Sequence, residues 1–282
     1  MRVLVTGAGG QLGWEVARAF AGSVHHVVAA DHAQLDVADR DAVLAAVAEL
    51  RPDAVVNTAA MTDVDGCEAH AQRAFQVNAL GPRHLADAAR RVGASVCHVS
   101  TDYVFSGELD RPWLEWDPPG PLSVYGRSKL AGESEVDPGS TVVRTSGLCS
   151  RHGRNFVKTM LRLATAGDGE VTVVDDQRTS PSFADEVADM IRFLVVDRRP
   201  GVFHVTNQGA TSWYGFAREI FALAGADPAR VVPVASDELR PPRPARRPPN
   251  SVLDNAALRL SGVALLADYH EPLERLVKDL VS

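Results

Sequence analysis

The sequence predicts an α/β protein in which helices cover both faces of a parallel sheet, with a smaller α+β region at the C-terminal end. Short β-branched runs alternate with longer amphipathic stretches through the first 150 residues, which is typical of βαβ units. A glycine-rich turn follows the first run, and the alternation weakens beyond residue 150. These three observations predict a doubly wound sheet followed by a less regular region.

The elements of the first half follow from hydrophobic periodicity and from residues that end helices. Pro52 ends one helix, and the segment 107–121 is a loop because it holds four prolines and two glycines. The run 95–100 shows little polar alternation, so we expect a strand buried on both faces. The predicted strands are 2–5, 26–30, 54–57, 95–100 and 141–145, and the predicted helices are 11–21, 39–50, 69–92 and 124–135.

The second half has fewer strands, and one segment belongs to neither class. Residues 240–250 contain five prolines and four arginines, which predicts an extended loop. Helices are expected at 155–166, 183–196 and 212–224, and strands at 171–174 and 202–205. We therefore predict one domain over 1–150, rejoined by about 183–206, and a smaller second domain over 151–182 and 207–282.

Composition limits the class of protein and its partners. The chain has 282 residues and a formal net charge of −7, which disfavours general nucleic-acid binding. No apolar run is long enough to span a bilayer, and the N-terminal apolar stretch is too short for a signal peptide. Cys67, Cys97 and Cys149 are odd in number and widely spaced, which favours a reducing compartment. We expect a soluble, cytoplasmic protein.

Gly7, Gly10 and Gly13 lie three residues apart, between the first predicted strand and the first predicted helix. This spacing is close to the dinucleotide-binding fingerprint, in which glycines let the backbone approach a pyrophosphate at a helix N-terminus. An ordinary strand-to-helix turn is the alternative, but the position favours a nucleotide site and a Rossmann-type sheet. A P-loop is disfavoured because no Gly-Lys-Ser/Thr follows.

Asp31 ends the second predicted strand, 18 residues after Gly13. A carboxylate at this point accepts hydrogen bonds from the adenosine ribose and repels a 2′-phosphate. A turn or helix-capping aspartate is a fair alternative. The residue favours NADH only slightly, so both NADPH and NADH stay open as the cofactor.

Tyr125 and Lys129 are four residues apart at the start of a predicted helix, which places both side chains on one face. A lysine ammonium in this position is expected to lower the tyrosine pKa and to make the phenol a usable acid and base. A solvent-exposed helix face is the common alternative. Thr101 ends a buried strand 24 residues upstream, where a hydroxyl could contact a substrate carbonyl.

These residues resemble the extended short-chain dehydrogenase/reductase superfamily and, more closely, the dTDP-4-dehydrorhamnose reductases. The similarity covers nearly the whole chain. Its main motifs are TGAGGQLG at 6–13, NTAAMTDVDGCE at 57–68, STDYVFSG at 100–107 and YGRSKLAGE at 125–133. The last two motifs are fairly specific for this family, whereas the glycine loop indicates only the superfamily.

The resemblance implies a reductase that transfers hydride from NADPH or NADH to C4 of a dTDP-4-keto-6-deoxyhexose, most closely dTDP-4-dehydro-L-rhamnose. It implies that Tyr125 is the proton donor, that Lys129 is its pKa partner and that Thr101 completes a catalytic triad. Asn78 either supports the active site or faces solvent. The implied cofactor contacts are Gly7, Gly10, Gln11, Leu12, Asp31, Asp36, Val37, Ala59, Ala60, Thr62, Tyr125 and Lys129, and the implied substrate contacts are Val64, Thr101, Asp102 and Gly147.

The chain departs from the family pattern in the part that contacts the sugar. Gly147 stands where many members have a tryptophan, and Arg178 stands where a glycine usually follows the DDQ motif. The identity of the sugar is therefore less firmly predicted than the reaction. Trp213 and Phe216 have helical spacing and are expected in the core. The arginines of 240–247 are left open between a solvated loop and a contact to the nucleotide diphosphate.

Two further interpretations stay open. The same resemblance extends to the regulatory β subunit of methionine adenosyltransferase, so a non-catalytic nucleotide-binding subunit is one alternative. Another sugar-nucleotide ketoreductase or an epimerase is the second, whereas dehydration is disfavoured because Tyr103 and Val104 follow Asp102 without a carboxylate pair. The histidines show no metal-ligand spacing, so no metal is expected. A homodimer stays open, and neither a nucleic acid nor a membrane is an expected partner.

Overall fold

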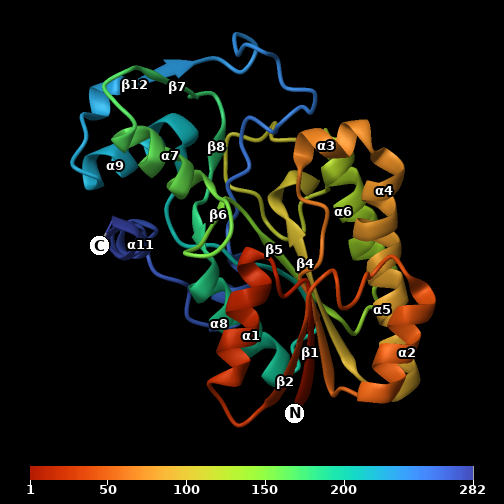
Figure 1. Ribbon diagram of the computed structural model, residues 1–282. Coiled ribbons are helices and arrows are strands. Elements are labelled where there is room, and N and C mark those ends of the chain that lie inside the picture. The colour runs from red at the N-terminus through yellow and green to blue at the C-terminus, as the bar shows by residue number, and fades with distance from the viewer. Residues whose placement is uncertain (282) are drawn as a thin grey trace.

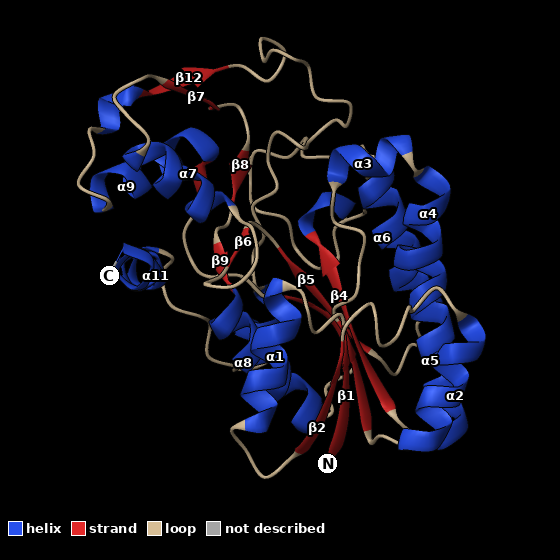
Figure 2. Ribbon diagram, viewed as in Figure 1, coloured by secondary structure: helices blue, strands red, loops and turns tan. Residues whose placement is uncertain are grey.

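The computed structural model describes residues 1–281, and its centre is a six-stranded parallel sheet. The strand order is β10-β5-β4-β3-β1-β2, so the chain starts in the sheet at β1 and builds outward in both directions. This is the doubly wound parallel sheet that the sequence predicts (Figure 2). The strands are β1 (Arg2–Thr6), β2 (His26–Ala30), β3 (Ala54–Asn57), β4 (Ser95–Thr101), β5 (Thr141–Thr145) and β10 (Gly201–His204).

Helices cover both faces of the sheet (Figure 1). On one face lie α1 (Gln11–Ala21) and α8 (Ala184–Val196), which pack against each other and bury Phe20 and Ile191. On the other face lie α2 (Arg40–Leu50), α5 (Gly81–Val92) and α6 (Val124–Glu135), and Val43 and Leu85 are among the side chains buried there. Because helices cover both faces, nearly every residue of β3, β4 and β5 is buried, and the polar residues are buried with the apolar ones.

The helix expected over 69–92 is present from Ala71 to Val92 as α4 (Ala71–Phe75), a π-helical turn (Gln76–Leu80) and α5, which follow one another without a break. A separate helix that the sequence did not predict, α3 (Val64–Ala69), precedes it. Helix α3 begins at Val64 because the Asp63 carboxylate accepts a hydrogen bond from the Gly66 amide and caps it. His70 leaves helical geometry, with φ −127° and ψ 48°, and so separates α3 from α4. Apolar periodicity alone does not register such a break.

A second core lies beyond the carboxyl ends of the sheet strands, where Figure 1 shows α7, α9, β7 and β12 grouped together. Phe216, Ile220 and Phe221 are fully buried in this core. Its elements are α7 (Phe156–Thr165), β7 (Val171–Val174), α9 (Trp213–Leu223), β12 (Val231–Val234) and α11 (His270–Val281). We propose the two-domain division of the chain on the basis of these separate cores, with α8 and β10 returning to the first.

Short elements complete the chain. They are β6 (Leu148–Cys149), β8 (Arg178–Thr179), β9 (Ser182–Phe183), β11 (Thr211–Ser212), α10 (Ala256–Leu260) and 3₁₀ turns at Asp102–Val104 and Pro228–Arg230. The expected loop at 240–250 contains no helix or strand. One end of it is anchored by Asn250, whose Nδ2 donates to the carbonyls of Leu109 and Arg111.

Within residues 1–281, no helix has both the length and the apolar character needed to cross a membrane. All three cysteines are buried and free of disulfides.

Candidate active site

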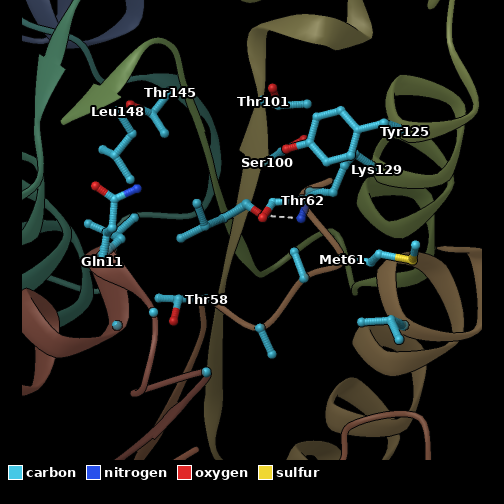
Figure 3. A pocket seen from close by; sticks show the side chains of 18 of the residues that line it. Gln11, Thr58, Met61, Thr62, Ser100, Thr101, Tyr125, Lys129, Thr145 and Leu148 are labelled. Atoms are coloured by element: carbon cyan, nitrogen blue, oxygen red, sulfur yellow. Dashed lines mark hydrogen bonds between the residues drawn. The ribbon is translucent and has the colours of Figure 1, made fainter. Parts of the chain in front are cut away.

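A cavity of about 1050 Å³ opens at the carboxyl ends of β1, β3, β4 and β5 and extends to the start of α9. Figure 3 shows Tyr125 and Lys129 reaching from α6 toward Ser100 and Thr101 on β4, with Gln11 on the opposite side. Every site residue named from the sequence lines this cavity: Gly7, Gly10, Gln11, Leu12, Asp31, Asp36, Val37, Ala59, Ala60, Thr62, Val64, Thr101, Asp102, Tyr125, Lys129 and Gly147.

The glycine loop joins β1 to α1 and has a shape that side chains would block. Gly7 has φ +75°, and a Cβ added there would lie 2.6 Å from the amide nitrogen of Ala59. A Cβ at Gly13 would run into the Gly7 carbonyl oxygen. Gly10 caps α1 without a side chain, and the first turn of the helix contains no acidic residue. The free amides and the positive end of the helix dipole fit a dinucleotide pyrophosphate.

The adenosine end of the cavity is bordered by two carboxylates. Asp31 follows β2, and its Oδ1 accepts a hydrogen bond from the Gln34 amide at 3.0 Å. Asp36 pairs with Arg73 at 2.8 Å. Partial burial works against the charge of Asp36, but the hydrogen bonds from Arg73 and from the Ala38 amide lower its pKa. Arg73 also lines the cavity, and no signal in the sequence identified it.

Tyr125 lies in the first turn of α6, whose N-terminus is capped by Ser123. Helical spacing places Tyr125 and Lys129 on one face of α6, as the sequence predicts. Burial raises the pKa of Tyr125, and a hydrogen bond with Thr101 acts in the opposite direction. The phenol therefore holds its proton at neutral pH, which is the state that a proton donor needs.

Lys129 is buried and its ammonium is bound to β4. The residue is 2% exposed, and its Nζ donates a hydrogen bond to the Val99 carbonyl at 2.6 Å, the dashed line in Figure 3. Burial lowers the Lys129 pKa to about 8, although Glu133 opposes this shift. The pKa of Tyr125 is raised and not lowered as its spacing from Lys129 predicts, because burial outweighs the hydrogen bond with Thr101.

Asp102 and its neighbours form a buried polar group at the other end of the cavity. The Asp102 carboxylate accepts hydrogen bonds from Thr101 Oγ1 at 2.9 Å and from Ser146 Oγ at 2.7 Å. Burial raises its pKa, while these hydrogen bonds act to lower it. Ser146 Oγ also lies 2.8 Å from Thr179 Oγ1. This network connects β4, the segment after β5, and β8.

Gly147 follows this network and has φ +52°. A Cβ added there would lie 3.1 Å from both the Ser180 carbonyl oxygen and Thr179 Oγ1. Any side chain at this position would therefore be strained and closely packed.

Asn78 is fully buried, which decides between the two alternatives in favour of structural support. Its Oδ1 accepts from the Met61 amide at 2.8 Å, and its Nδ2 donates to the Met61 carbonyl at 3.1 Å and to Ser128 Oγ at 2.9 Å. These contacts fix the loop after β3 against α6. The π-helical turn holds Asn78 in this position, and such turns often occur at functional sites.

Two regions of the cavity wall were missed by the sequence analysis. Trp213 was expected in the core; it packs on Phe156 with ring centroids 4.7 Å apart, but it also lines the cavity. Asn155 lines it too, and its Nδ2 donates to Gln11 Oε1 at 3.0 Å. Trp213 stands in no local motif, whereas Asn155 begins the Asn-Phe pair that also resembles the family, although no cavity contact was expected of it. Each reaches the cavity through the packing of the second core.

Within residues 1–281, no cluster of three or more histidine, cysteine, aspartate or glutamate side chains could hold a metal ion.

The fold and the site define a dinucleotide-binding α/β protein with the tyrosine and lysine arrangement of short-chain reductases. The chain belongs to the family described as the RmlD substrate binding domain, whose model matches residues 1–282. The resemblance predicted from the motifs is thereby confirmed.

Two curated relatives are similar over almost all of their length. A probable dTDP-4,6-dihydroxy-2-methyloxan-3-one 4-ketoreductase of Streptomyces antibioticus is 43% identical over 100% of this chain and 96% of the relative. A dTDP-4-dehydrorhamnose reductase of Streptomyces griseus is 44% identical over 96% of this chain and 91% of the relative.

Two solved structures share the fold. A dTDP-4-dehydrorhamnose reductase of Clostridium acetobutylicum is 40% identical, with a TM-score of 0.96 and full coverage of both chains. The Bacillus anthracis dTDP-4-dehydrorhamnose reductase in complex with NADP is 36% identical, with a TM-score of 0.92 over 99% of each chain.

Proposed function

We propose that this protein is an NADPH- or NADH-dependent oxidoreductase that reduces the C4 keto group of dTDP-4-dehydro-L-rhamnose to give dTDP-L-rhamnose. The main support for the proposal is that Thr101, Tyr125 and Lys129 line the same cavity as the glycine loop. The names of the relatives support the reaction, and the NADP complex of one of them supports the cofactor class.

The residues around the reacting carbonyl have separate roles in this proposal. Tyr125 donates its phenolic proton to the sugar oxygen as negative charge develops there. Thr101 holds that oxygen by a hydrogen bond, and the charged Lys129 stabilises the phenolate that remains. NADPH or NADH, when bound, supplies the hydride. The residues thus orient the ketone and control one proton.

The remaining cavity residues are proposed as binding groups. Gly7, Gly10, Gln11 and Leu12 would hold the pyrophosphate at the start of α1. Asp31 would accept hydrogen bonds from the ribose. The adenosine and nicotinamide contacts would come from Asp36, Val37, Ala59, Ala60 and Thr62, and the sugar contacts from Val64, Asp102 and Gly147.

A second candidate substrate has its own support. One relative is named for reduction of dTDP-4,6-dihydroxy-2-methyloxan-3-one. Gly147 lines the cavity and brings no side chain into the part assigned to the sugar. A different 4-keto sugar linked to dTDP is therefore the alternative substrate, with the same reaction and the same catalytic residues. The homodimer and the cytoplasmic location stay predictions.

The test follows the absorbance of reduced nicotinamide when purified protein meets dTDP-4-dehydro-L-rhamnose, with NADPH and NADH assayed separately. Tyr125→Phe should lower turnover by about 10²- to 10⁴-fold, because general acid catalysis is lost. Cofactor affinity, measured by fluorescence titration, should change little. Tyr214→Phe is the matched control, since Tyr214 stacks with Arg218 and does not line the cavity.

Three results would change the proposal. Near-normal turnover in Tyr125→Phe would remove Tyr125 from the mechanism. Turnover of another dTDP-linked 4-keto sugar alone would favour the alternative substrate. Cofactor binding without turnover of any such sugar, together with a stable complex with a partner enzyme, would favour the non-catalytic nucleotide-binding subunit.

A further inference from the structure

The helix that carries Tyr125 and Lys129 bears a third ionisable side chain on the same face, which the proposed reaction leaves unused. Glu133 follows Lys129 by four residues, just as Lys129 follows Tyr125, so the three side chains form one row along α6. The Glu133 side chain is only 8% exposed. A buried carboxylate at this depth requires partners, and they come from two strands of the sheet.

Glu133 is held on β5 by Arg144 and on β4 by Ser100. Its Oε2 accepts from Arg144 Nη2 at 2.6 Å, and its Oε1 accepts from Arg144 Nε at 2.9 Å and from Ser100 Oγ at 2.5 Å. The Arg144 side chain is 6% exposed, and its guanidinium lies over the Phe105 ring at 5.1 Å. The two hydrogen bonds from Arg144 hold its guanidinium, whose positive charge is permanent, in a fixed place next to the wall of the cavity.

Glu133 opposes the effect of burial on the protonation of Lys129. Burial lowers the Lys129 pKa to about 8, and Glu133 raises it against that trend. His98 stays neutral because burial and the Lys129 charge hold its pKa well below the usual value. Burial raises the pKa of Tyr125, Asp102 and Tyr103, which face this region from α6 and from the turn after β4. His204, which lies 3.5 Å from Arg144 Nη1, stays neutral because burial and the Arg144 charge lower its pKa to about 3.

We propose that Glu133 is a positioning residue that keeps the Lys129 ammonium charged beside Tyr125 by neutralising Arg144. With Glu133 in place, two buried cations share one carboxylate and the group carries one net positive charge. Without it, two buried cations would lie beside adjacent residues of β4, because Lys129 bonds to the Val99 carbonyl and Arg144 is paired in register with Ser100. Lys129 would then release its proton, because an arginine keeps its own at any physiological pH.

The Lys129 charge can be measured directly, because the chain contains only three lysines: Lys129, Lys158 and Lys278. Protein labelled with ¹³C at lysine Cε would be titrated by NMR, with Lys158→Arg and Lys278→Arg assigning the signals. In the unmodified chain the Lys129 signal should titrate at a pH of about 8. In Glu133→Gln the midpoint should fall by about one pH unit, a tenfold change in the protonation equilibrium.

The variant Glu133→Gln/Arg144→Gln separates electrostatics from structure. It removes one charge of each sign, so the Lys129 midpoint should return toward that of the unmodified chain. A midpoint that stays in place in Glu133→Gln would overturn the inference and leave Glu133 a purely structural role. If Glu133→Gln does not fold, Arg144→Gln gives the opposite test: the Lys129 midpoint must rise, and an unmoved midpoint overturns the inference.

The effect on turnover rests on the proposed reductase function, whereas the titration does not. In Glu133→Gln, the alkaline limb of the kcat profile should move to lower pH together with the Lys129 midpoint. A loss of kcat by the same factor at every pH would contradict the inference. Absence of turnover with every 4-keto sugar, alongside the predicted titrations, would instead refute the proposed function and leave this inference standing.

Discussion

The two ends of the cavity are built in different ways. At the cofactor end, part of the wall is backbone, where the loop of Gly7 and Gly13 passes close to the chain after β3. At the substrate end, the wall is made of side chains such as Asp102 and Trp213. A backbone wall depends on a short local motif, whereas a side-chain wall depends on packing between distant segments. The first end can therefore be recognised from the sequence, whereas the second cannot.

The largest effect, a loss of cofactor affinity, is expected from Gly13→Ala. The added Cβ would run into the Gly7 carbonyl oxygen, so the loop must shift away from the position that accepts a pyrophosphate. We expect cofactor affinity to fall by about 100-fold or more, the equivalent of about 2.7 kcal/mol. Fluorescence titration with NADPH and NADH would measure this loss.

The matched control is Gly139→Ala, because an added Cβ there meets nothing within 4 Å. It should leave both cofactor affinity and melting temperature close to those of the unmodified chain. Unchanged cofactor binding in Gly13→Ala would show that the glycine loop does not hold the cofactor. The contrast between the two ends would then be lost.

The same contrast explains what the sequence could predict. The sheet strands and α1 follow from local periodicity, and the cofactor end follows from one glycine motif. Trp213 could not be placed, because its position depends on how Phe156 and Phe216 pack in the second core. The short helix α3 was missed because it depends on the Asp63 cap and ends at His70, just where the predicted helix begins.

The pKa values of the site residues could not be predicted from the sequence either. The spacing of Tyr125 and Lys129 predicted their common face correctly. It could not predict that burial would raise the tyrosine pKa, nor that the lysine would donate to the Val99 carbonyl. Desolvation depends on the whole surrounding structure. The geometry of a motif can therefore be predicted from the sequence, whereas the pKa values of its residues cannot.

A medium effect is expected at the substrate end from Trp213→Ala. The indole lines the cavity, and its loss removes an aromatic surface worth about 0.5–1.5 kcal/mol beyond area burial. We expect the KM for the dTDP-sugar to rise by up to about tenfold while cofactor affinity stays unchanged. Initial-rate kinetics with saturating cofactor would measure it.

Phe216→Ala is the comparison variant, because Phe216 lies three residues further along α9 and is fully buried. It should reduce the free energy of unfolding by about 3–5 kcal/mol, mainly through the cavity it leaves. If Trp213→Ala shows the same loss of stability and no change in KM, then Trp213 is a core residue, as its spacing first suggested.

The smallest effect is expected from Asp31→Asn at the cofactor end, where this one carboxylate borders the cavity. The substitution removes a charge that would repel the 2′-phosphate of NADPH. It keeps an oxygen that can accept from the Gln34 amide, so the turn after β2 should stay in place. We expect the ratio of kcat/KM for NADPH to that for NADH to rise about three- to tenfold.

Asp168→Asn serves as the control, since Asp168 is exposed and does not line the cavity. Both chains would be assayed with each cofactor at two salt concentrations, because added salt weakens the effect of an exposed charge. A cofactor ratio that moves in Asp31→Asn, and moves less at high salt, places the carboxylate beside the ribose. An unmoved ratio would mean that Asp31 only shapes its turn.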